Sequence, residues 1–306
     1  MQQKRIKRPV DGMLLLDKPA GLSSNQALQQ AKRLYQAAKA GHTGSLDPFA
    51  TGLLPICLGE ATKFSHFLLD ADKTYCATMQ LGATTTTGDT EGEIVSRAEV
   101  DVTREQIENA LRCFTGSISQ VPPMYSALKH QGKALYEYAR AGVEIERPAR
   151  EVTIHRIALN SLADSNAEIT VSCSKGTYIR TLAEDIGKTL GCGAYLTQLR
   201  RLQTGCFDLA QAVTLEQLEA MDMAKRDTCL LPPDSLVQQL PAIYLDAESA
   251  YYLCRGQSIW KSGVTQQGFL RLYEGSQRFL GLGEVADDGR IAPRRLINSP
   301  AADAKN

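Results

Sequence analysis

Apolar and polar residues follow two different spacings along this 306-residue chain, and together they predict a mixture of strands and helices. Alternation predicts strands at residues 12–16, 74–81, 168–173 and 193–202. Helical spacing predicts helices at residues 23–38, 59–69, 103–114 and 177–190. The first of these helices begins with Ser23 and Gln26 in a capping-box pattern. Residues 83–92, which contain four consecutive threonines, are predicted to form a polar turn.

The pattern changes near residue 240, where short predicted strands alternate with glycine-containing turns. These strands are expected at residues 242–245, 269–273, 279–284 and 290–297. An acidic, proline-containing segment at residues 214–241 precedes them and is predicted to be the connection. A chain of 306 residues is long enough for two domains, so we expect one at residues 1–240 and a second at residues 241–306.

One segment, residues 41–55, fits neither spacing and reads GHTGSLDPFATGLLP. Its glycines, prolines and hydroxyl residues predict that no long regular element forms there. Its leucines and Phe49 are nevertheless too apolar for a loop lying free in solvent. A stiff, partly buried loop is typical of a segment that holds a functional group in place. Asp47 lies in its middle, although an Asp followed by Pro48 is by itself also a common helix start.

Composition excludes several classes of protein. No apolar run reaches the roughly 18–20 residues that a membrane span requires, and no secretory signal pattern follows the basic start of the chain. The eight cysteines include no C-x-x-C pair, which disfavours a zinc site or a disulfide framework. We therefore expect a cytoplasmic protein that uses no metal and no cofactor, because no phosphate-binding glycine motif or metal triad is present either.

Charge is distributed unevenly, although the net charge is zero. Residues 1–50 carry 8 basic against 3 acidic side chains, whereas residues 201–250 carry 3 against 8. Such a chain can still present one positive face to phosphates. Tyrosines are interleaved with lysines and arginines between residues 121 and 150, which suits nucleic acid because bases stack and phosphates are anionic. An ordinary helix with a basic outer face explains the same pattern equally well.

The motifs of this chain resemble those of the TruB family of tRNA pseudouridine synthases. Residues 41–55 resemble the catalytic loop of that family. Further matching blocks follow in the family's order and span the chain from about residue 14 to residue 296: Asp17-Lys18-Pro19, Lys73-Thr74-Tyr75, SKGTYIRTLAEDIG at 174–187, GAYLTQLRR at 193–201 and GRIAPRRL at 289–296.

The resemblance implies an α+β fold with two parts. The first is a catalytic domain built on a mixed, largely antiparallel sheet with flanking helices. The second is a small C-terminal β-barrel that is similar to the RNA-binding PUA domain. Stand-alone members of the family carry an insertion that closes over tRNA, and residues 123–150 correspond to it.

The resemblance also implies the activity and the site residues. The activity would be isomerisation of uridine 55, in the T-loop of tRNA, to pseudouridine. Asp47, Tyr75 and Arg180 match the catalytic residues, with Asp47 as the nucleophile. The substrate-binding residues would be His42, Tyr75, Tyr178, the main chain of Leu199 and, as a phosphate contact at the rim, Lys18.

The residue types suit this chemistry. A carboxylate can attach to a carbon atom and leave again, as the isomerisation requires. Arg180 falls in the first turn of a predicted helix, where a cation opposes the helix dipole unless an anion pairs with it, and Asp47 is the expected anion. Tyr75 would stack on the base and take part in proton transfer. A T-loop uridine is stacked, so it must be flipped out at a cost of a few kcal/mol.

The expected partner is the T-arm of tRNA, bound by a monomer without a guide RNA and without a membrane. A guide-RNA-dependent branch of the superfamily lacks the insertion, so residues 123–150 favour the stand-alone branch. A tRNA-folding chaperone, in which catalysis is secondary, is the alternative function. Whether Asp47 attacks C6 of the base or C1′ of the ribose stays open.

Overall fold

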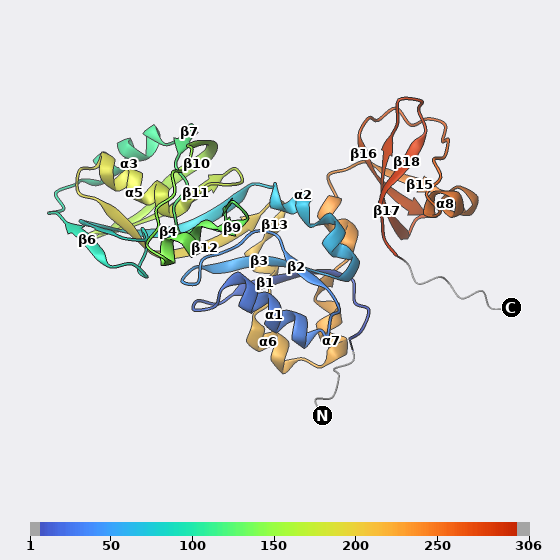
Figure 1. Ribbon diagram of the computed structural model, residues 1–306, viewed down its shortest axis with the longest axis horizontal. Helices are drawn as coiled ribbons and strands as arrows, with labels where there is room; N and C mark the ends of the chain where they lie inside the picture. Colours follow the sequence, from blue (N-terminus) through green and yellow to red (C-terminus); the bar gives the residue numbers. More distant parts are fainter. Residues whose placement is uncertain (1–6, 299–306) are drawn as a thin grey trace.

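The structure is a computed structural model that describes residues 7–298, and its elements form three groups along the long axis (Figure 1). Strand β4, strands β7 and β10 to β12 and helices α3 and α5 gather at one end, and β1, β3, α1, α6 and α7 lie in the middle. Strands β15 to β18 and helix α8 form the other end. Residues 1–6 and 299–306, which belong to the ends of the two predicted domains, lie outside the described residues.

A ten-stranded sheet runs through the first two groups in the order β14-β1-β3-β12-β4-β11-β10-β7, with β2 beside β3 and β13 beside β12. All of its pairings are antiparallel except that of β3 with β12, so the predicted mixed and largely antiparallel sheet is confirmed. Its strands are β1 (Gly12–Lys18), β2 (Ala40–His42), β3 (Thr51–Leu58), β4 (Lys73–Leu81), β7 (Gly116–Gln120), β10 (Arg150–Ala163), β11 (Asn166–Cys173), β12 (Ala194–Thr204), β13 (Phe207–Asp208) and β14 (Leu230–Leu231).

One half of this sheet buries a single face. Buried and half-exposed residues alternate along the whole of β4, because successive side chains of a strand point to opposite faces. Its buried face packs with α3 (Arg104–Cys113) and α5 (Ile179–Thr189), which contribute Ile107, Leu182 and Ile186 to the same core. No helix in residues 7–298 is long and apolar enough to cross a membrane.

The other half is buried on both faces, which explains the continuous apolar runs in β1 and β3. One face of this half packs beneath α1 (Ser24–Leu34), whose Ala27 and Ala31 are fully buried. The opposite face packs with the 3₁₀ helix η1 (Gly59–Phe64) and α2 (Ser65–Leu69), where a single α-helix was predicted.

Residues 41–55, in which no long regular element was predicted, contain parts of two strands with an irregular loop between them. Strand β2 ends at His42 and β3 begins at Thr51, so the irregular loop spans only residues 43–50. Gly52 explains the misleading signal. Its φ is +101°, and a Cβ atom there would lie 2.3 Å from the carbonyl oxygen of Arg201. A glycine is therefore needed where β12 meets β3 and does not mark a turn.

Residues 214–241 do more than connect two parts. They form α6 (Leu215–Ala220), α7 (Met223–Thr228), β14 and the 3₁₀ helix η3 (Pro233–Val237). Leu231 of β14 pairs with Met13 of β1, so this segment belongs to the large sheet. The acidic side chains misled the prediction because Glu216 and Glu219 of α6 are exposed while Leu215 and Leu218 of the same helix are buried.

The predicted small C-terminal β structure is present as a four-stranded sheet in the order β15-β16-β17-β18. Its strands are β15 (Ala242–Leu245), β16 (Phe269–Glu274), β17 (Arg278–Val285) and β18 (Ile291–Leu296), joined by the unpredicted helix α8 (Ala247–Cys254). Only β15 and β16 are parallel. Strand pairing within residues 7–298 leaves this sheet open, so the expected barrel is not closed.

Candidate active site

The loop at residues 43–50 carries Asp47 and is fixed to helix α1 by one serine. The Ser24 hydroxyl accepts a hydrogen bond from the Leu46 amide at 2.7 Å and donates one to the Leu46 carbonyl at 3.0 Å. On the other side of Asp47, the Pro48 carbonyl accepts a hydrogen bond from the Gly21 amide at 2.9 Å. The residues before and after Asp47 are therefore both held by the start of α1.

Lys18, the predicted phosphate contact at the rim, also holds this loop. Its side chain is fully buried, and its ammonium donates to the carbonyls of Leu22 at 2.6 Å and Pro48 at 3.3 Å. Burial lowers the pKa of Lys18 to about 8. In this structure Lys18 therefore supports the loop at residues 43–50 through main-chain carbonyls, and its contact with a phosphate stays a prediction.

Two consecutive arginines at the end of β12 tie down the flanks of the loop. Arg201 is fully buried, and its guanidinium donates to the carbonyls of Leu53 at 2.7 Å and Gly44 at 3.1 Å. Arg200 forms a two-pronged ion pair with Asp17, at 2.6 and 3.1 Å. Neither arginine was singled out from the sequence, because only the pairing of β12 with β3 brings them to the loop.

Arg180 lies beside Asp47, as predicted. Nε of Arg180 is 3.0 Å from Oδ2 of Asp47, and Nη2 is 3.4 Å from Oδ1, so two edges of the fork face the carboxylate. The Arg180 side chain is 4% exposed, whereas that of Asp47 is 37% exposed. The arginine therefore orients the carboxylate from below and leaves its outer side open to a ligand.

Asp89 is a second anion on the same guanidinium, and sequence reasoning missed it. Its Oδ2 is 3.4 Å from Nη1 of Arg180, which also donates to the Thr87 carbonyl at 3.0 Å. Asp89 is almost fully buried and sits in the predicted polar turn, where an Asp usually faces solvent. The GDTEG pattern gave no sign that this turn lies over α5.

The electrostatic balance at Asp47 favours its neutral form more than in water. Burial raises the pKa of Asp47, the Arg180 cation lowers it, and the neighbouring Asp89 carboxylate raises it again. The net direction is upward from the usual value of 3.8. Lys18 contributes a smaller lowering of the same pKa, so both cations help to keep the carboxylate ionised.

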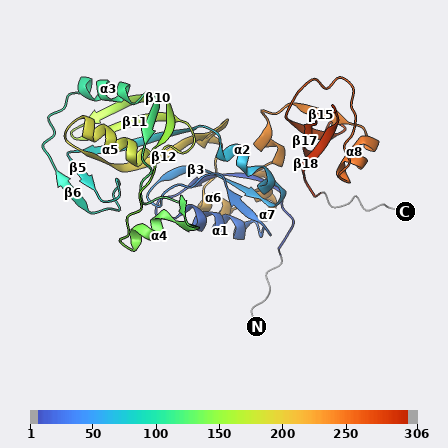
Figure 2. The ribbon, with the colours of Figure 1, turned by 45° about the horizontal axis from the view of Figure 1, so that its top comes forward.

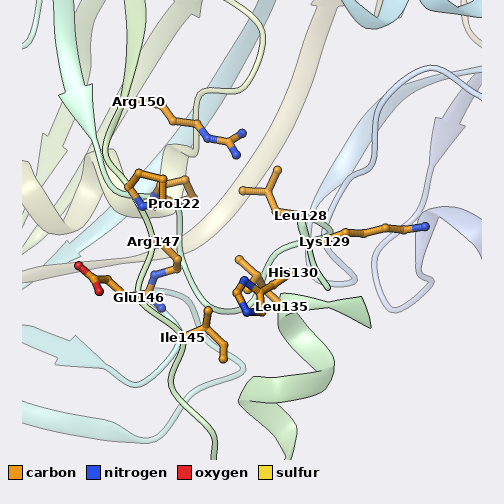
Figure 3. Close-up of a pocket in the computed structure, with 10 residues that line it drawn as sticks. Pro122, Leu128, Lys129, His130, Leu135, Ile145, Glu146, Arg147 and Arg150 are labelled. Atoms are coloured by element: carbon orange, nitrogen blue, oxygen red, sulfur yellow. The ribbon is translucent and has the colours of Figure 1, made fainter. Parts of the chain in front are cut away.

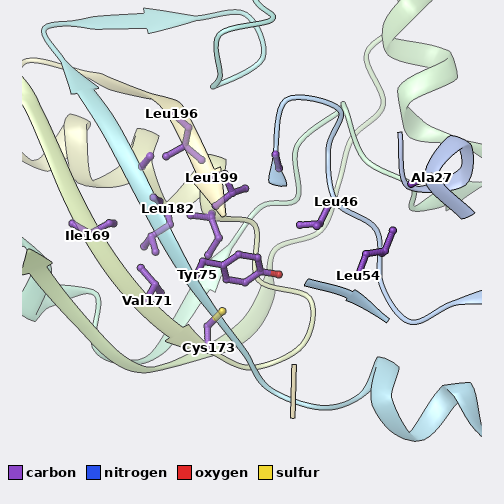
Figure 4. Close-up of a cluster of buried hydrophobic side chains, with 14 of the residues drawn as sticks. Ala27, Leu46, Leu54, Tyr75, Ile169, Val171, Cys173, Leu182, Leu196 and Leu199 are labelled. Atoms are coloured by element: carbon purple, nitrogen blue, oxygen red, sulfur yellow. The ribbon is translucent and has the colours of Figure 1, made fainter. Parts of the chain in front are cut away.

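Tyr75 projects from β4 into the space beside this loop (Figure 4). It is 9% exposed and shares a core with Leu46 and Leu199, both of which Figure 4 places around its ring. Burial raises the pKa of its phenol, and the Arg201 cation opposes this rise. The phenol is thus a neutral hydroxyl at neutral pH and available to donate a proton.

The other predicted substrate contacts border the same region. His42 ends β2, and its buried Nδ1 has no hydrogen-bond partner within residues 7–298. Burial lowers the pKa of His42, with a further lowering from Arg201, so its ring is neutral. Leu199 of β12 pairs with Ala77 of β4. The next residue, Arg200, pairs with Thr51, where β3 begins directly after the loop at residues 43–50. Leu199 therefore lies beside this loop. Tyr178 is the N-cap of α5 and precedes the helix in which it was predicted to lie.

Residues 121–149, which we call the arm, leave the sheet between β7 and β10 and return to it, and α4 (Leu135–Arg140) projects from the body (Figure 2). A pocket at the arm is lined by Leu128, His130, Arg147 and Arg150, among others (Figure 3). Nε and Nη1 of Arg147 are buried, and neither has a hydrogen-bond partner within residues 7–298. The alternative of an ordinary helix with a basic outer face fits only α4, which is six residues long.

Histidine, cysteine, aspartate and glutamate side chains do not gather anywhere in residues 7–298 in a group of three or more that could hold a metal ion.

Comparison with known protein families settles the relationship of the chain. The N-terminal domain model of TruB family pseudouridylate synthases matches residues 32–179. The tRNA pseudouridylate synthase B C-terminal domain matches residues 180–238, and the C-terminal domain of pseudouridine synthase II TruB matches residues 241–297. The tRNA pseudouridine synthase B of Methylobacillus flagellatus is 64% identical over 297 residues, which cover 97% of this chain and 98% of the relative. The chain belongs to the TruB family.

Other members of the TruB family are similar over comparable lengths. The tRNA pseudouridine synthase B of Nitrosospira multiformis is 57% identical, over 95% of this chain and 96% of the relative. Among solved structures, a Cbf5-Nop10-Gar1 complex contains a chain with a TM-score of 0.70 and 22% identity, covering 96% of this TruB-family chain and 92% of the other. This likeness shows that the two chains share a fold.

Proposed function

We propose that this TruB-family protein isomerises uridine 55 of tRNA to pseudouridine, with Asp47 as the nucleophile. The observation that carries the proposal is the arrangement at the loop: a half-open carboxylate fixed from below by the buried fork of Arg180. A carboxylate that served only to bind a ligand would not need a loop held at Leu46, Pro48 and Gly44. Such fixation suits a group that must meet one carbon atom in one geometry.

The isomerisation conserves the composition of the nucleoside and exchanges one of its hydrogens with solvent. The N1–C1′ bond breaks, the base rotates, and C5 forms a new bond to C1′. The hydrogen on C5 then leaves as a proton, and N1 ends with a proton of its own. Asp47 would attach covalently during this sequence, either at C1′ or at C6, and would leave with its electron pair at the end. Arg180 keeps the carboxylate ionised and aimed while it is free.

The remaining site residues would hold the base. The uridine would leave its stack to reach Asp47, and the ring of Tyr75 offers a face on which it can stack. The neutral ring of His42 would contact the flipped nucleotide or fill the space that it leaves. Tyr178 and the main chain of Leu199, which borders the loop, would complete the pocket.

The arm and the C-terminal sheet would bind the T-arm of the tRNA. Nη2 of Arg147 lies 3.6 Å from Glu144, but its buried Nε and Nη1 have no acceptor within residues 7–298. These two donors suit a phosphate oxygen, because buried donors without acceptors are costly. On the C-terminal part, Arg255 stacks 3.7 Å from the ring centre of Tyr251, and Trp260 is 67% exposed. Exposed aromatic and cationic groups together favour nucleic acid.

We also propose that residues 1–240 form the catalytic domain and residues 241–306 an RNA-binding domain, in a monomer that needs no guide RNA. The arm supports this proposal, since a protein that grips the tRNA itself does not require a guide. The apolar cluster shared by Phe64, Leu236 and Phe279 joins the two domains. Deleting the second domain would expose this cluster, so point substitutions on its surface are the better test.

Release of tritium from uracil C5 tests the proposed function, because isomerisation must expel that hydrogen. The substrate is a tRNA transcript labelled at C5 of its uridines, and the matched control is the same transcript with cytidine in place of uridine 55. We expect release equivalent to one uridine per tRNA from the first transcript and none above background from the second. Equal release from both would place the target elsewhere, and no release from either would reject the activity.

A further inference from the structure

The arm begins where a strand ladder ends. Strands β7 and β10 pair from Gly116 with Ile154 to Gln120 with Arg150, and the arm spans the residues between the last pair. Any displacement of the arm therefore acts first on Gln120 and Arg150. Gln120 is 2% exposed, which is unusual for a glutamine unless its amide is fully used.

Both the oxygen and the nitrogen of the Gln120 side-chain amide form hydrogen bonds with one residue of another element. Its Oε1 accepts a hydrogen bond from the Tyr178 amide at 2.8 Å, and its Nε2 donates to the Tyr178 carbonyl at 3.0 Å. This side chain thus pairs with the main chain of Tyr178 as a neighbouring strand would. Tyr178 is the N-cap of α5, and no side chain from within α5 caps that end. Gln120 fills this role from the foot of the arm.

The residue held in this way directs the catalytic pair. Arg180 follows Tyr178 by two positions, in the first turn of α5, so the path of the main chain at Tyr178 sets the origin of the Arg180 side chain. A second link joins the same two parts, because Nη2 of Arg180 donates to the Tyr125 carbonyl of the arm at 2.7 Å. That Nη2 group also faces Oδ1 of Asp47 at 3.4 Å.

Simple packing explains these contacts less well. A buried glutamine that only filled space could use any acceptor and any donor nearby, whereas both bonds go to the main chain of one residue at a helix start. The two links also start from different residues and share a target. Gln120 immediately precedes the arm, Tyr125 lies near its start, and both contact the segment from Tyr178 to Arg180.

We propose that Gln120 is a positioning residue for the reaction. It fixes the start of α5 to the foot of the arm, so that Arg180 aims Asp47 and the position of the arm is transmitted to the catalytic pair. This inference rests on the proposed function, because it assigns to Gln120 the alignment of the groups that carry out that reaction. It predicts a loss in the chemical step and not in RNA affinity.

The test compares Gln120→Met, which keeps the length of the side chain and removes both hydrogen bonds, with Gln80→Met. Gln80 lies near the C-terminal end of β4, away from the site. Its side-chain amide donates to the Leu81 carbonyl, so the control variant loses a similar hydrogen bond. Rates are measured as tritium release with enzyme in saturating excess over labelled tRNA. Affinity and thermal unfolding are measured on the same proteins.

We expect Gln120→Met to lower the saturated rate at least about tenfold, because small misplacements of catalytic groups are costly. Its tRNA affinity should stay within a few-fold of wild type, and its melting temperature should match that of Gln80→Met. Equal saturated rates for both variants would overturn the proposal. A second outcome would also overturn it. If Gln120→Met melts at a lower temperature, the assay is repeated at a temperature lowered by the same difference. Recovery of the wild-type rate there would show that Gln120 is a purely structural residue.

A second measurement does not depend on activity. With ¹⁵N-labelled tyrosine, the Tyr178 amide should exchange with deuterium faster in Gln120→Met than in the control, because its acceptor is gone. Unchanged exchange would contradict the proposed link. An inactive wild-type enzyme would reject the proposed function, whereas an active wild type with an unaffected Gln120→Met would reject only this inference.

Discussion

Arg180 presents two nitrogens to the two oxygens of Asp47, at 3.0 and 3.4 Å, from a position beneath the loop that is closed to solvent. The same guanidinium contacts Asp89, Thr87 and Tyr125. Each of its three nitrogens therefore has its own acceptor, and a single ammonium could not reach all of these acceptors. This arrangement makes the planar fork, and not only the positive charge, the feature that aligns the carboxylate.

Replacement of Arg180 tests that distinction. Arg180→Met should lower the single-turnover rate by at least about 100-fold, as loss of a preorganised charged donor does elsewhere. Arg180→Lys should recover only part of this loss, since an ammonium cannot face both Asp47 oxygens and the Tyr125 carbonyl at once. The measurement is tritium release at saturating tRNA. Full activity of Arg180→Lys would show that charge alone is sufficient.

The acid limb of the reaction should report the pKa of Asp47. A protonated carboxyl is not a nucleophile, and the pKa of Asp47 is raised by burial, so the rate should fall as pH drops through a value above 3.8. Asp89→Asn removes a neighbouring anion that raises this pKa, so the limb should move to lower pH. The asparagine can still accept the Glu91 amide bond. Single-turnover rates measured across the acidic pH range check both statements. If the acid limb of Asp89→Asn stays where it is in the wild type, Asp89 does not raise the pKa of Asp47.

The pocket of the arm predicts a phosphate contact. Arg147→Met should weaken tRNA binding and reduce the slope of log affinity against log salt by about 0.7–0.9, the value for one lost phosphate contact. The saturated rate should not change. Arg104→Met is the matched control, because Arg104 lies on exposed α3 and pairs with Glu108. If both variants have the slope of wild type, Arg147 does not contact phosphate.

Local patterns predicted the elements that one periodic face defines. The alternation in β4 and β11 identifies the side of each strand that faces the core, and the Ser23 capping box starts α1 as expected. The C-terminal strands were also found within a few residues of their observed ends. These signals are local, so the sequence alone contains them.

Contacts between distant segments could not be predicted in the same way. Asp89 and Gln120 look like ordinary polar residues until the fold brings them to α5. Lys18 at the end of β1 looks like an ordinary solvated lysine, yet the carbonyl oxygens of Leu22 and Pro48 accept hydrogen bonds from its ammonium. Gly52 resembled a turn glycine because the crossing of β12 is invisible in the sequence. The pairing of Asp47 with Arg180 was predicted because both residues lie in motifs that resemble those of the family.

The nucleophilic role of Asp47 is tested most directly by Asp47→Asn, which is nearly isosteric and cannot form the covalent bond. The measurement is tritium release from C5-labelled tRNA with the variant in excess, alongside tRNA affinity and thermal unfolding. We expect a folded protein that binds tRNA within a few-fold of wild type and releases no tritium above a control without enzyme. Measurable release by a folded Asp47→Asn protein would contradict the account.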